Sequence, residues 1–376
     1  MTDICVQYCG SLFDTTGYGE ANRAFVTALH LAGVNVTTEP VVQTSFRATH
    51  GWEGELAKQL ENRRIPYRVK IIHLTPDIAT KYFTKGCYHI QHLFWETDKL
   101  PEEWIAPLNQ MNEIWVSSLH MKKLVESNGV KVPIFAFPQP IDITHADKNY
   151  EAYQIPYHKG FMFYSIFQWL DRKNPQALLR AYWEAFEGRQ DVTLLLKTFR
   201  FNYGNDEFAK IREDINKWKI GFGSDFIFPK VLLVKDLLTK EAMMRIHRTG
   251  DCYVSCSRGE GWERPMAEAL LMGKTAISTA RGGIHEYLND EHYFRLDDER
   301  VPVIENPLIK YYTADQHWFD VDIGHLKKTM WFVFNKNNIA SAKGIVAKDH
   351  IKNLFSYHKI GQQMLERLRV IYQTLV

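Results

Sequence analysis

Short apolar runs alternate with amphipathic segments along most of this chain. The first repeat of the pattern is an apolar run at 4–9, a loop at 10–19 that contains three glycines, and the segment 20–32, whose apolar residues recur at helical spacing. Gly33 supplies the stop that commonly follows the end of a helix. Strand, loop and helix repeated in this way predict parallel sheets whose strands are joined by crossover helices.

The same alternation continues to about residue 290. The predicted strands are 4–9, 69–74, 88–94, 114–116 and 134–137 in the first part, and 161–167, 193–197, 226–228, 251–255 and 275–278 in the second. The predicted helices include 20–32, a helix that begins near Leu119 with Ser118 as its cap, 175–186, 239–247 and 265–272.

A polar, turn-prone stretch between about 143 and 160 separates two series of strands and helices. Because 376 residues exceed what one hydrophobic core usually organises, we predict two doubly wound, Rossmann-like domains, 1–148 and 149–352. Residues 353–376 carry one apolar face at helical spacing, so we expect a helix that returns to pack on the first domain. The predicted fold class is therefore α/β.

The amino-acid composition excludes some classes of protein but does not indicate which reaction this one catalyses. The 46 Lys and Arg residues balance 44 Asp and Glu residues, a net charge of +2, so no strong field indicates a polyanionic partner. The chain opens on a strand-like run with no secretory segment before its five cysteines, and we expect reduced thiols in a cytoplasmic protein. No apolar run approaches the roughly 18 residues of a transmembrane segment.

The segment from Arg258 to Gly273 carries the most chemistry. It follows a predicted strand, passes two glycines and begins a helix at Pro265, so backbone N–H groups and the positive end of a helix dipole favour an anion there. Glu260 in the loop and Glu268 one turn inside the helix would accept hydrogen bonds from a polyol. A nucleotide sugar has both an anionic group and several hydroxyls. In the purely structural alternative, Glu260 is a solvated loop residue and Glu268 interacts favourably with the helix dipole.

The stretch GEGWERPMAEALLMGKTAISTARGG resembles the glutamate–seven residues–glutamate segment of retaining glycosyltransferases of family 4, which have the GT-B fold of two Rossmann-like domains. The resemblance extends from about residue 10 to 290. Further stretches in the family's order are Gly17-Tyr-Gly-Glu-Ala-Asn-Arg23, Ala28-Leu-His-Leu-Ala-Gly33, Trp95-Glu-Thr-Asp98, Trp115-Val-Ser-Ser118, Pro138-Gln-Pro-Ile-Asp142, Arg172-Lys-Asn-Pro175 and Gly282-Gly283.

The resemblance implies a role for each matched residue. Glu260 would contact the hydroxyls of the donor sugar, Glu268 the ribose hydroxyls, and Lys173 the diphosphate. The backbone around the loop would approach the sugar and diphosphate; its residues are Gly261, Trp262, Glu263 and Arg264.

One departure concerns a second positive charge on the diphosphate. Many relatives carry an arginine about six residues before the lysine, where this chain has Ile166 and Phe167. The candidates to replace it are Arg172, Lys197 and Arg258. We favour Lys197 slightly because it ends a predicted strand and would point into the crevice. The alternative is an ordinary solvent-exposed lysine at the end of a strand.

The first domain contributes weaker signals. Gly17 and Gly19 would allow a loop backbone to approach the diphosphate closely. They lack the third glycine and the acidic residue of a dinucleotide fingerprint, which disfavours a nicotinamide oxidoreductase. Glu96 follows a predicted strand and so lies at the sheet edge where ligands of such folds bind. It is a candidate acceptor-binding or assisting group. Alternatively, Glu96 caps the next helix.

These observations favour a metal-independent retaining transferase that moves a hexose, preferably glucose, from a nucleoside-diphosphate sugar, preferably UDP, without a further cofactor. The resemblance implies front-face attack, in which the leaving phosphate accepts the proton of the acceptor hydroxyl. The acceptor stays open among a glycan, a lipid-linked sugar, a small molecule and a modified base in nucleic acid. Residues 1–150 hold 14 Lys and Arg against 16 Asp and Glu, which gives the last option no support from charge.

Aromatic and basic residues between Phe46 and Tyr88 are the expected acceptor-contacting region. A non-catalytic nucleotide-sugar-binding protein and a GT-B phosphorylase or epimerase are the alternatives. Glu260, Lys173 and Glu268 together favour catalysis over a binding protein.

Overall fold

The computed structural model describes residues 4–42, 51–156, 160–304 and 309–375. The chain divides into two compact units. The first contains the chain up to Ile143, the short segment Lys310–Tyr312 and the C-terminal Lys352–Val376; the second contains Thr144–Ile309 and Thr313–Ile351. Phe46, at the start of the expected acceptor region, lies outside the described residues.

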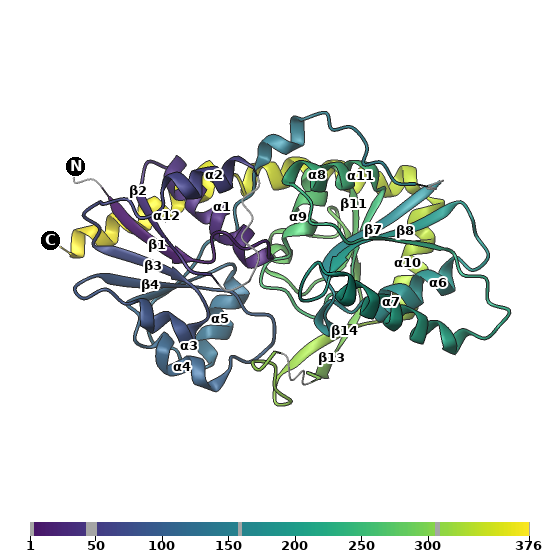
Figure 1. Cartoon of the computed structure of the whole chain (residues 1–376), viewed down its shortest axis with the longest axis horizontal. Helices are drawn as coiled ribbons and strands as arrows, with labels where there is room; N and C mark the ends of the chain where they lie inside the picture. Colours follow the sequence, from purple (N-terminus) through teal and green to yellow (C-terminus); the bar gives the residue numbers. More distant parts are fainter. Residues whose placement is uncertain (1–3, 43–50, 157–159, 305–308, 376) are drawn as a thin grey trace. The chain divides into compact units, whose positions relative to one another are not determined.

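The sheet of the first unit has six parallel strands in the order β2-β1-β3-β4-β5-β6 (Figure 1). They are β1 (Cys5–Gly10), β2 (Asn35–Pro40), β3 (Val69–His73), β4 (Tyr88–Leu93), β5 (Glu113–Val116) and β6 (Ile134–Ala136). The five predicted strands are confirmed to within one residue at each end. The edge strand β2 escaped prediction because its sequence, Asn-Val-Thr-Thr-Glu-Pro, contains little apolar signal.

Helices cover both faces of this sheet. They are α1 (Gly17–Leu31), α2 (Trp52–Gln59), α3 (Pro76–Ala79), α4 (Glu102–Leu108), α5 (Leu119–Ser127) and α12 (Tyr357–Thr374), with a 3₁₀ turn at Thr80–Tyr82. Figure 1 shows α1, α2 and α12 on one face and α3, α4 and α5 on the other. Ser118 caps α5 as predicted, since its hydroxyl accepts a hydrogen bond from Met121 N at 3.1 Å.

The second unit has a six-stranded parallel sheet in the order β12-β11-β10-β7-β8-β9 and a separate antiparallel hairpin. The strands are β7 (Phe161–Gln168), β8 (Val192–Phe199), β9 (Lys230–Val234), β10 (Cys252–Ser255), β11 (Thr275–Thr279) and β12 (Phe294–Leu296), and the hairpin is β13 (Asp298–Pro302) with β14 (His317–Val321). Consecutive side chains of a strand point to opposite faces, and accordingly Phe163 of β7 belongs to the main core cluster of this unit whereas Met162, which is also buried, does not.

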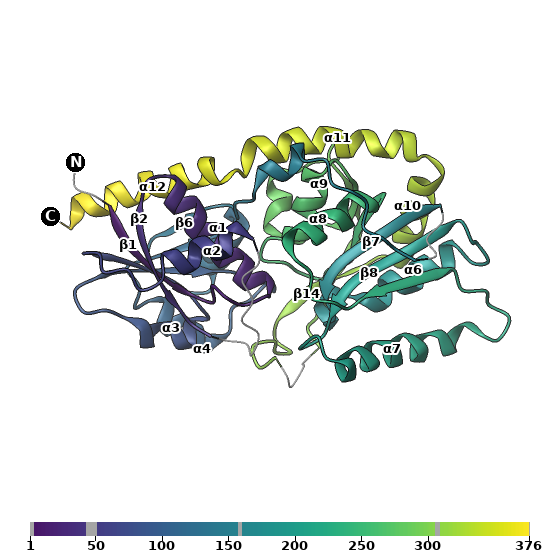
Figure 2. The ribbon, with the colours of Figure 1, turned by 45° about the horizontal axis from the view of Figure 1, so that its top comes forward.

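The helices of the second unit are α6 (Pro175–Ala185), α7 (Asn205–Lys219), α8 (Lys240–Thr249), α9 (Arg264–Leu271), α10 (Ile323–Asn335) and most of α11 (Asn337–Leu354). Short 3₁₀ turns lie at Ile143–Asp147, Asp171–Lys173, Ile220–Phe222 and Gly283–Tyr287. Figure 2 shows α8, α9 and α11 on one side of the sheet and α6 and α7 on the other. The α/β class with parallel sheets is thereby confirmed.

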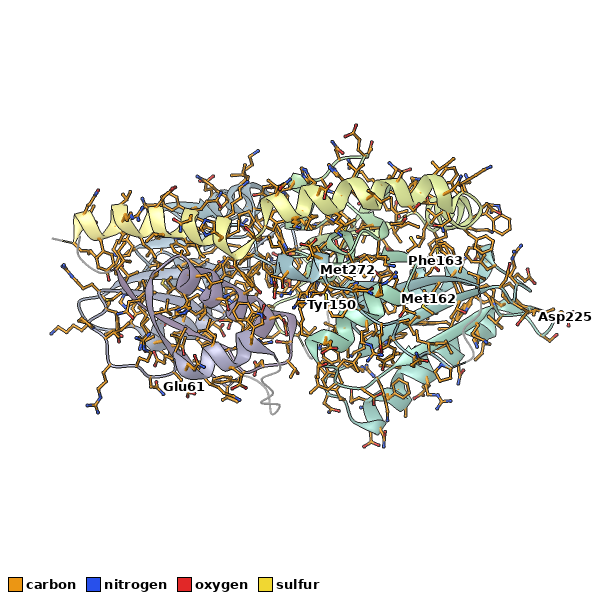
Figure 3. All side chains as sticks on the ribbon, turned by 90° about the horizontal axis from the view of Figure 1, so that it is seen from above. Glu61, Tyr150, Met162, Phe163, Asp225 and Met272 are labelled. Atoms are coloured by element: carbon orange, nitrogen blue, oxygen red, sulfur yellow. The ribbon has the colours of Figure 1, made fainter. Side chains whose placement is uncertain are left out.

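One predicted strand is wrong. Residues 226–228 lie in the connection after α7, close to exposed Asp225 (Figure 3), and the strand begins only at Lys230. The apolar side chains pack against other aromatic rings instead: the ring centroids of Phe226 and Phe228 lie 4.7 Å apart, and those of Phe228 and Trp183 lie 5.1 Å apart. Side-chain packing without a backbone ladder gives the same sequence signal as a short strand.

The C-terminal helix α12 lies along α1 in the first unit, as Figures 1 and 2 both show. Its apolar stripe, which includes Ile360, Met364 and Leu368, is buried in the core of that unit. Arg367 Nη2 forms an ion pair with buried Glu113 Oε2 at 2.6 Å. The predicted return helix is confirmed. No helix in the described ranges is both long and apolar enough to span a bilayer.

Gly361 tests the close contact between α1 and α12. A Cβ at this position would lie 2.2 Å from Ala28 O. Glycine to alanine in a helix interior usually stabilises by about 1 kcal/mol, but we expect Gly361→Ala to lower the free energy of unfolding by about 1–3 kcal/mol because of overpacking. Urea unfolding followed by circular dichroism measures the change.

Gly221→Ala is the matched control, because no atom outside its chain neighbours lies within 4 Å of a Cβ built there. Stability that rises in Gly361→Ala would contradict the close helix contact.

Candidate active site

A small pocket lies at the carboxyl ends of β7 and β10 in the second unit. These two strands are neighbours in the sheet, and the order of strands reverses between them. Loops that leave such neighbouring strands in opposite directions open a crevice, which is where ligands bind in doubly wound sheets. The pocket is lined by Ser165, Ile166, Phe167, Lys173, Tyr253, Ser255, Cys256, Ser257, Glu260, Glu263 and Pro265.

Two of the predicted catalytic residues meet in this pocket. Lys173 Nζ donates to Glu260 Oε1, and Arg172 Nη1 lies 3.2 Å from Glu260 Oε2. All three side chains are largely buried. The carboxylate is thereby held between two cations in a site from which water is largely excluded.

Backbone hydrogen bonds tie the two loops that carry these side chains. Arg258 N donates to Arg172 O at 2.7 Å and joins these two loops, while Glu260 N donates to Arg281 O at 2.7 Å and ties the second loop to the connection after β11. Asn174 adopts a left-handed conformation, φ 52°, and its side chain donates to Asp320 Oδ1 at 2.6 Å while accepting from Ala177 N. Asparagine tolerates this region better than most residues. The turn therefore directs Lys173 into the pocket before α6 begins.

Burial and the ion pair shift the pKa values of both Glu260 and Lys173. Burial alone would raise the pKa of Glu260, but the charges of Lys173 and Arg172 outweigh it and lower that pKa to about 2. Burial lowers the pKa of Lys173, although the Glu260 carboxylate opposes the shift. Glu260 is thus ionised throughout the physiological range.

Glu268, expected to contact ribose, lies one turn inside α9 and carries a second cluster of cations. Lys240 Nζ donates to its Oε1, and Arg264 Nε donates to the same oxygen at 2.8 Å. His247 Nε2 lies 3.6 Å from Oε2. Burial would raise the pKa of Glu268, but Lys240 and Arg264 hold it well below its ordinary value. Contact with ribose hydroxyls would require Glu268 to share its oxygens with these cations.

The loop before α9 places the other predicted donor-binding residues. Gly261 and buried Trp262 follow Glu260, and Ile284 N donates to Trp262 O at 3.2 Å. Arg264 begins the helix, and Glu263 precedes it without forming a side-chain cap. Gly282 is a close neighbour of this loop, since a Cβ there would lie 2.9 Å from that of Glu260.

None of the three candidates for the second diphosphate cation belongs to the pocket lining formed by the described residues, although Arg172 contacts Glu260, which does. Arg258 is engaged elsewhere, with Nε 3.2 Å from Asp320 Oδ1 and its guanidinium over the Trp318 ring. Lys197 lies opposite pocket-lining Ile166 in the β7–β8 ladder and is 5% exposed. Burial, opposed by Asp236, lowers the pKa of Lys197 to about 8.

The predicted residues of the first unit lie at the carboxyl ends of its strands. Gly17 begins α1 with open space around it, whereas a Cβ on Gly19 would lie 2.2 Å from Asp14 O, so the turn itself requires that glycine. Glu96 Oε2 accepts a hydrogen bond from Tyr312 OH at 3.2 Å.

Sequence reasoning missed the partners that fix the pocket. Asp320 orients both Asn174 and Arg258, and Lys240 neutralises Glu268. His285 accompanies Glu263, with Nε2 2.9 Å from Oε2. No local motif marks any of these side chains, because each reaches its partner only through the fold of the sheet.

No protein-family model and no curated protein sequence matches this chain. Solved structures match it along nearly its whole length. HepE of Anabaena in complex with UDP-glucose has a TM-score of 0.67 at 13% identity, over 98% of this chain and 100% of that one. Sucrose-phosphate synthase from Thermosynechococcus elongatus has a TM-score of 0.68 at 13% identity, over 99% and 100%. The chain has the GT-B fold.

A third solved structure, a glycosyltransferase from Rickettsia africae, has a TM-score of 0.66 at 13% identity, over 99% of each chain. Identity this low establishes the fold alone, because one fold supports many reactions.

The Glu260 ion pair predicts how stability responds to acid. A carboxyl group whose pKa falls from its ordinary 4.5 to about 2 on folding stabilises the fold above about pH 4.5, and that stabilisation is lost as the pH falls toward 2. We expect Glu260→Gln to lose less free energy of unfolding than wild type between pH 5 and pH 2.5, measured by urea unfolding at each pH.

Exposed Glu187→Gln is the control and is expected to follow wild type. Parallel pH curves for Glu260→Gln and wild type would show that the carboxylate is not held in this ion pair.

Proposed function

We propose that this protein is a retaining glycosyltransferase of the family 4 type that transfers a hexose, with glucose favoured, from UDP to an acceptor hydroxyl without a metal ion. The contact between Lys173 and Glu260 at the strand-order reversal of the second unit carries the proposal. The solved structures with this fold include HepE bound to UDP-glucose, which supports a nucleotide sugar as the ligand.

The ion pair supplies both halves of a donor site. A diphosphate that enters the pocket would take Lys173 as its counter-ion, and the freed Glu260 carboxylate would then accept hydrogen bonds from sugar hydroxyls. Without ligand, the two side chains neutralise each other, so neither buried charge is left alone. The same exchange applies to Lys240, Arg264 and Glu268 near the ribose.

Retention follows from front-face attack. The acceptor oxygen would bond to the anomeric carbon on the side from which UDP leaves, the bond from that carbon to the phosphate oxygen would break, and the acceptor proton would pass to the leaving phosphate. Lys173 and the N-terminus of α9 would stabilise the charge that develops on UDP. Neither a metal ion nor a carboxylate nucleophile is needed for this sequence.

Lys197 is our candidate for the second cation. It lies in the ladder beside Ile166, which lines the pocket, and its ammonium group is 5.1 Å from the centre of the Tyr203 ring. A largely buried lysine gains a favourable partner when a diphosphate arrives, which raises its pKa and strengthens binding.

The acceptor is a glycan, a lipid-linked sugar, another hydroxyl-bearing small molecule or a modified base, and Glu96 is the proposed acceptor-side residue. The buried thiols Cys9, Cys252 and Cys256 suit a reducing compartment, so we propose a cytoplasmic location.

Loss of the lysine tests the function directly. We expect Lys173→Met to lower kcat/KM for acceptor-free hydrolysis of UDP-glucose by about 100- to 1,000-fold, because one electrostatic contact to the leaving group is lost. Release of UDP measures the rate, and proton NMR of the first-formed glucose reports retention as the α anomer. A chelator is expected to change neither result.

Exposed Lys217→Met is the matched control and is expected to keep wild-type rates. Binding of UDP-glucose without turnover, even with a panel of acceptors, would favour a nucleotide-sugar-binding protein. Absence of binding to UDP-, GDP- and ADP-sugars would refute the proposal.

The pKa of Lys197 gives an independent prediction. An ammonium with a pKa of about 8 is charged below that pH and neutral above it. We expect the affinity for UDP, measured calorimetrically, to fall between pH 7 and pH 9 in wild type, because the anion loses a cationic partner. Lys197→Met should bind UDP more weakly at pH 7 and show a flatter dependence. Equal slopes for the two proteins would remove Lys197 from the site.

A further inference from the structure

Glu263 has an unusual backbone conformation for its residue type. Its φ is 81° and its ψ is 58°, in the left-handed region. Among the described residues, the other non-glycines with positive φ are Asn62 and Asn174. Asparagine tolerates this region because its short amide bonds locally, whereas a glutamate has no such compensation. Strain of this kind persists only where the surrounding structure enforces it, and strained residues cluster at active sites and ligand-binding loops.

The side chain of Glu263 lines the pocket and is only partly satisfied. It is 3% exposed, and its Oε2 accepts a hydrogen bond from His285 Nε2 at 2.9 Å. Ser278 Oγ lies 3.4 Å from each carboxylate oxygen, but its single proton has a closer acceptor in Thr279 O at 2.9 Å. Oε1 therefore has capacity for a stronger donor.

Charge distinguishes Glu263 from the other pocket carboxylate. Glu260 is neutralised by Lys173 and Arg172, whereas Glu263 has no lysine or arginine ion pair in the described part of the chain. A buried carboxylate with one neighbouring imidazole gains from an additional hydrogen-bond donor.

His285 fixes the direction of this carboxylate. Its side chain is 4% exposed, follows Gly283 in a 3₁₀ turn, and packs against Tyr293 with ring centroids 5.1 Å apart. The tautomer that donates from Nε2 fits this contact with a carboxylate oxygen. The imidazole therefore holds Oε2 and leaves Oε1 as the available acceptor.

We propose that Glu263 is a specificity-determining residue that accepts a hydrogen bond from one hydroxyl of the donor's sugar, with His285 as its positioning residue. The inference rests on the proposed function and deepens it. A sugar hydroxyl supplies the donor that Oε1 lacks, while the phosphates are excluded as its partner because they repel a carboxylate. A donor sugar without that hydroxyl leaves Oε1 unsatisfied and is discriminated against.

The test compares donors that differ by one hydroxyl. Wild type, Glu263→Gly and Glu263→Gln are assayed for acceptor-free hydrolysis of UDP-glucose and of its 3-deoxy, 4-deoxy and 6-deoxy analogues, and for calorimetric binding of UDP alone. We expect both variants to lower kcat/KM for UDP-glucose by about 10- to 100-fold, the range of a hydrogen bond to a charged group. For one deoxy analogue, the variants and wild type should agree within about threefold, and binding of UDP should stay unchanged.

Two controls separate this role from a structural one. Asn62→Gly removes a left-handed non-glycine residue in the first unit and is expected to leave donor selectivity unchanged. His285→Gln can still donate to Glu263 and should keep more selectivity among the deoxy analogues than His285→Ala. A purely structural role of His285 would lower all donor rates equally.

The result that would overturn the inference is an equal loss on UDP-glucose, on all three deoxy analogues and on UDP. If wild type turns over UDP-glucose but the variants show this equal loss, the proposed transferase function stands and Glu263 has no role in sugar recognition. Failure of wild type to bind any nucleotide sugar would overturn the proposed function, and this inference with it.

Discussion

The second unit is organised around a buried carboxylate held between two cations. Glu260, Lys173 and Arg172 would each be costly to bury alone, so the loops that carry them must be fixed together. Backbone hydrogen bonds from Arg258 N to Arg172 O and from Glu260 N to Arg281 O provide that fixation. The pocket lies beside these joined loops, at the carboxyl ends of β7 and β10 where the order of strands reverses.

A second buried carboxylate, one turn inside α9, is also neutralised by neighbouring cations. Glu268 is surrounded by Lys240, Arg264 and His247 and is as deeply buried as Glu260. Both clusters keep a carboxylate ionised and place cations within reach of it. Such a surface suits a ligand that carries anionic groups beside hydroxyls, since each half of the ligand can replace one partner of an existing ion pair. This is the physical reason for preferring a nucleotide sugar over a purely neutral or purely anionic ligand.

The first unit depends on different forces. Apolar burial between α1 and α12, with the approach allowed by Gly361, joins the end of the chain to the sheet that its beginning forms. The buried pair of Arg367 and Glu113 fixes α12 near β5. Apolar packing, to which the α1–α12 interface contributes, stabilises this unit, whereas ion pairs fix the side chains of the pocket.

The sequence by itself determined most strands, the helices around the pocket and the return helix. Their signals are the spacing of apolar residues, the glycines and the helix caps, which all depend on residues close together in the chain. The resemblance also selected Glu260 and Lys173. Only the tertiary structure decided which groups meet: Lys173 and Glu260 are 87 positions apart, and Asn174 and Asp320 are 146 apart. The left-handed Glu263, its contact with His285 and the replacement of the strand at 226–228 by an aromatic cluster had no local signature, because each follows from the order of strands in the sheet and the burial it imposes.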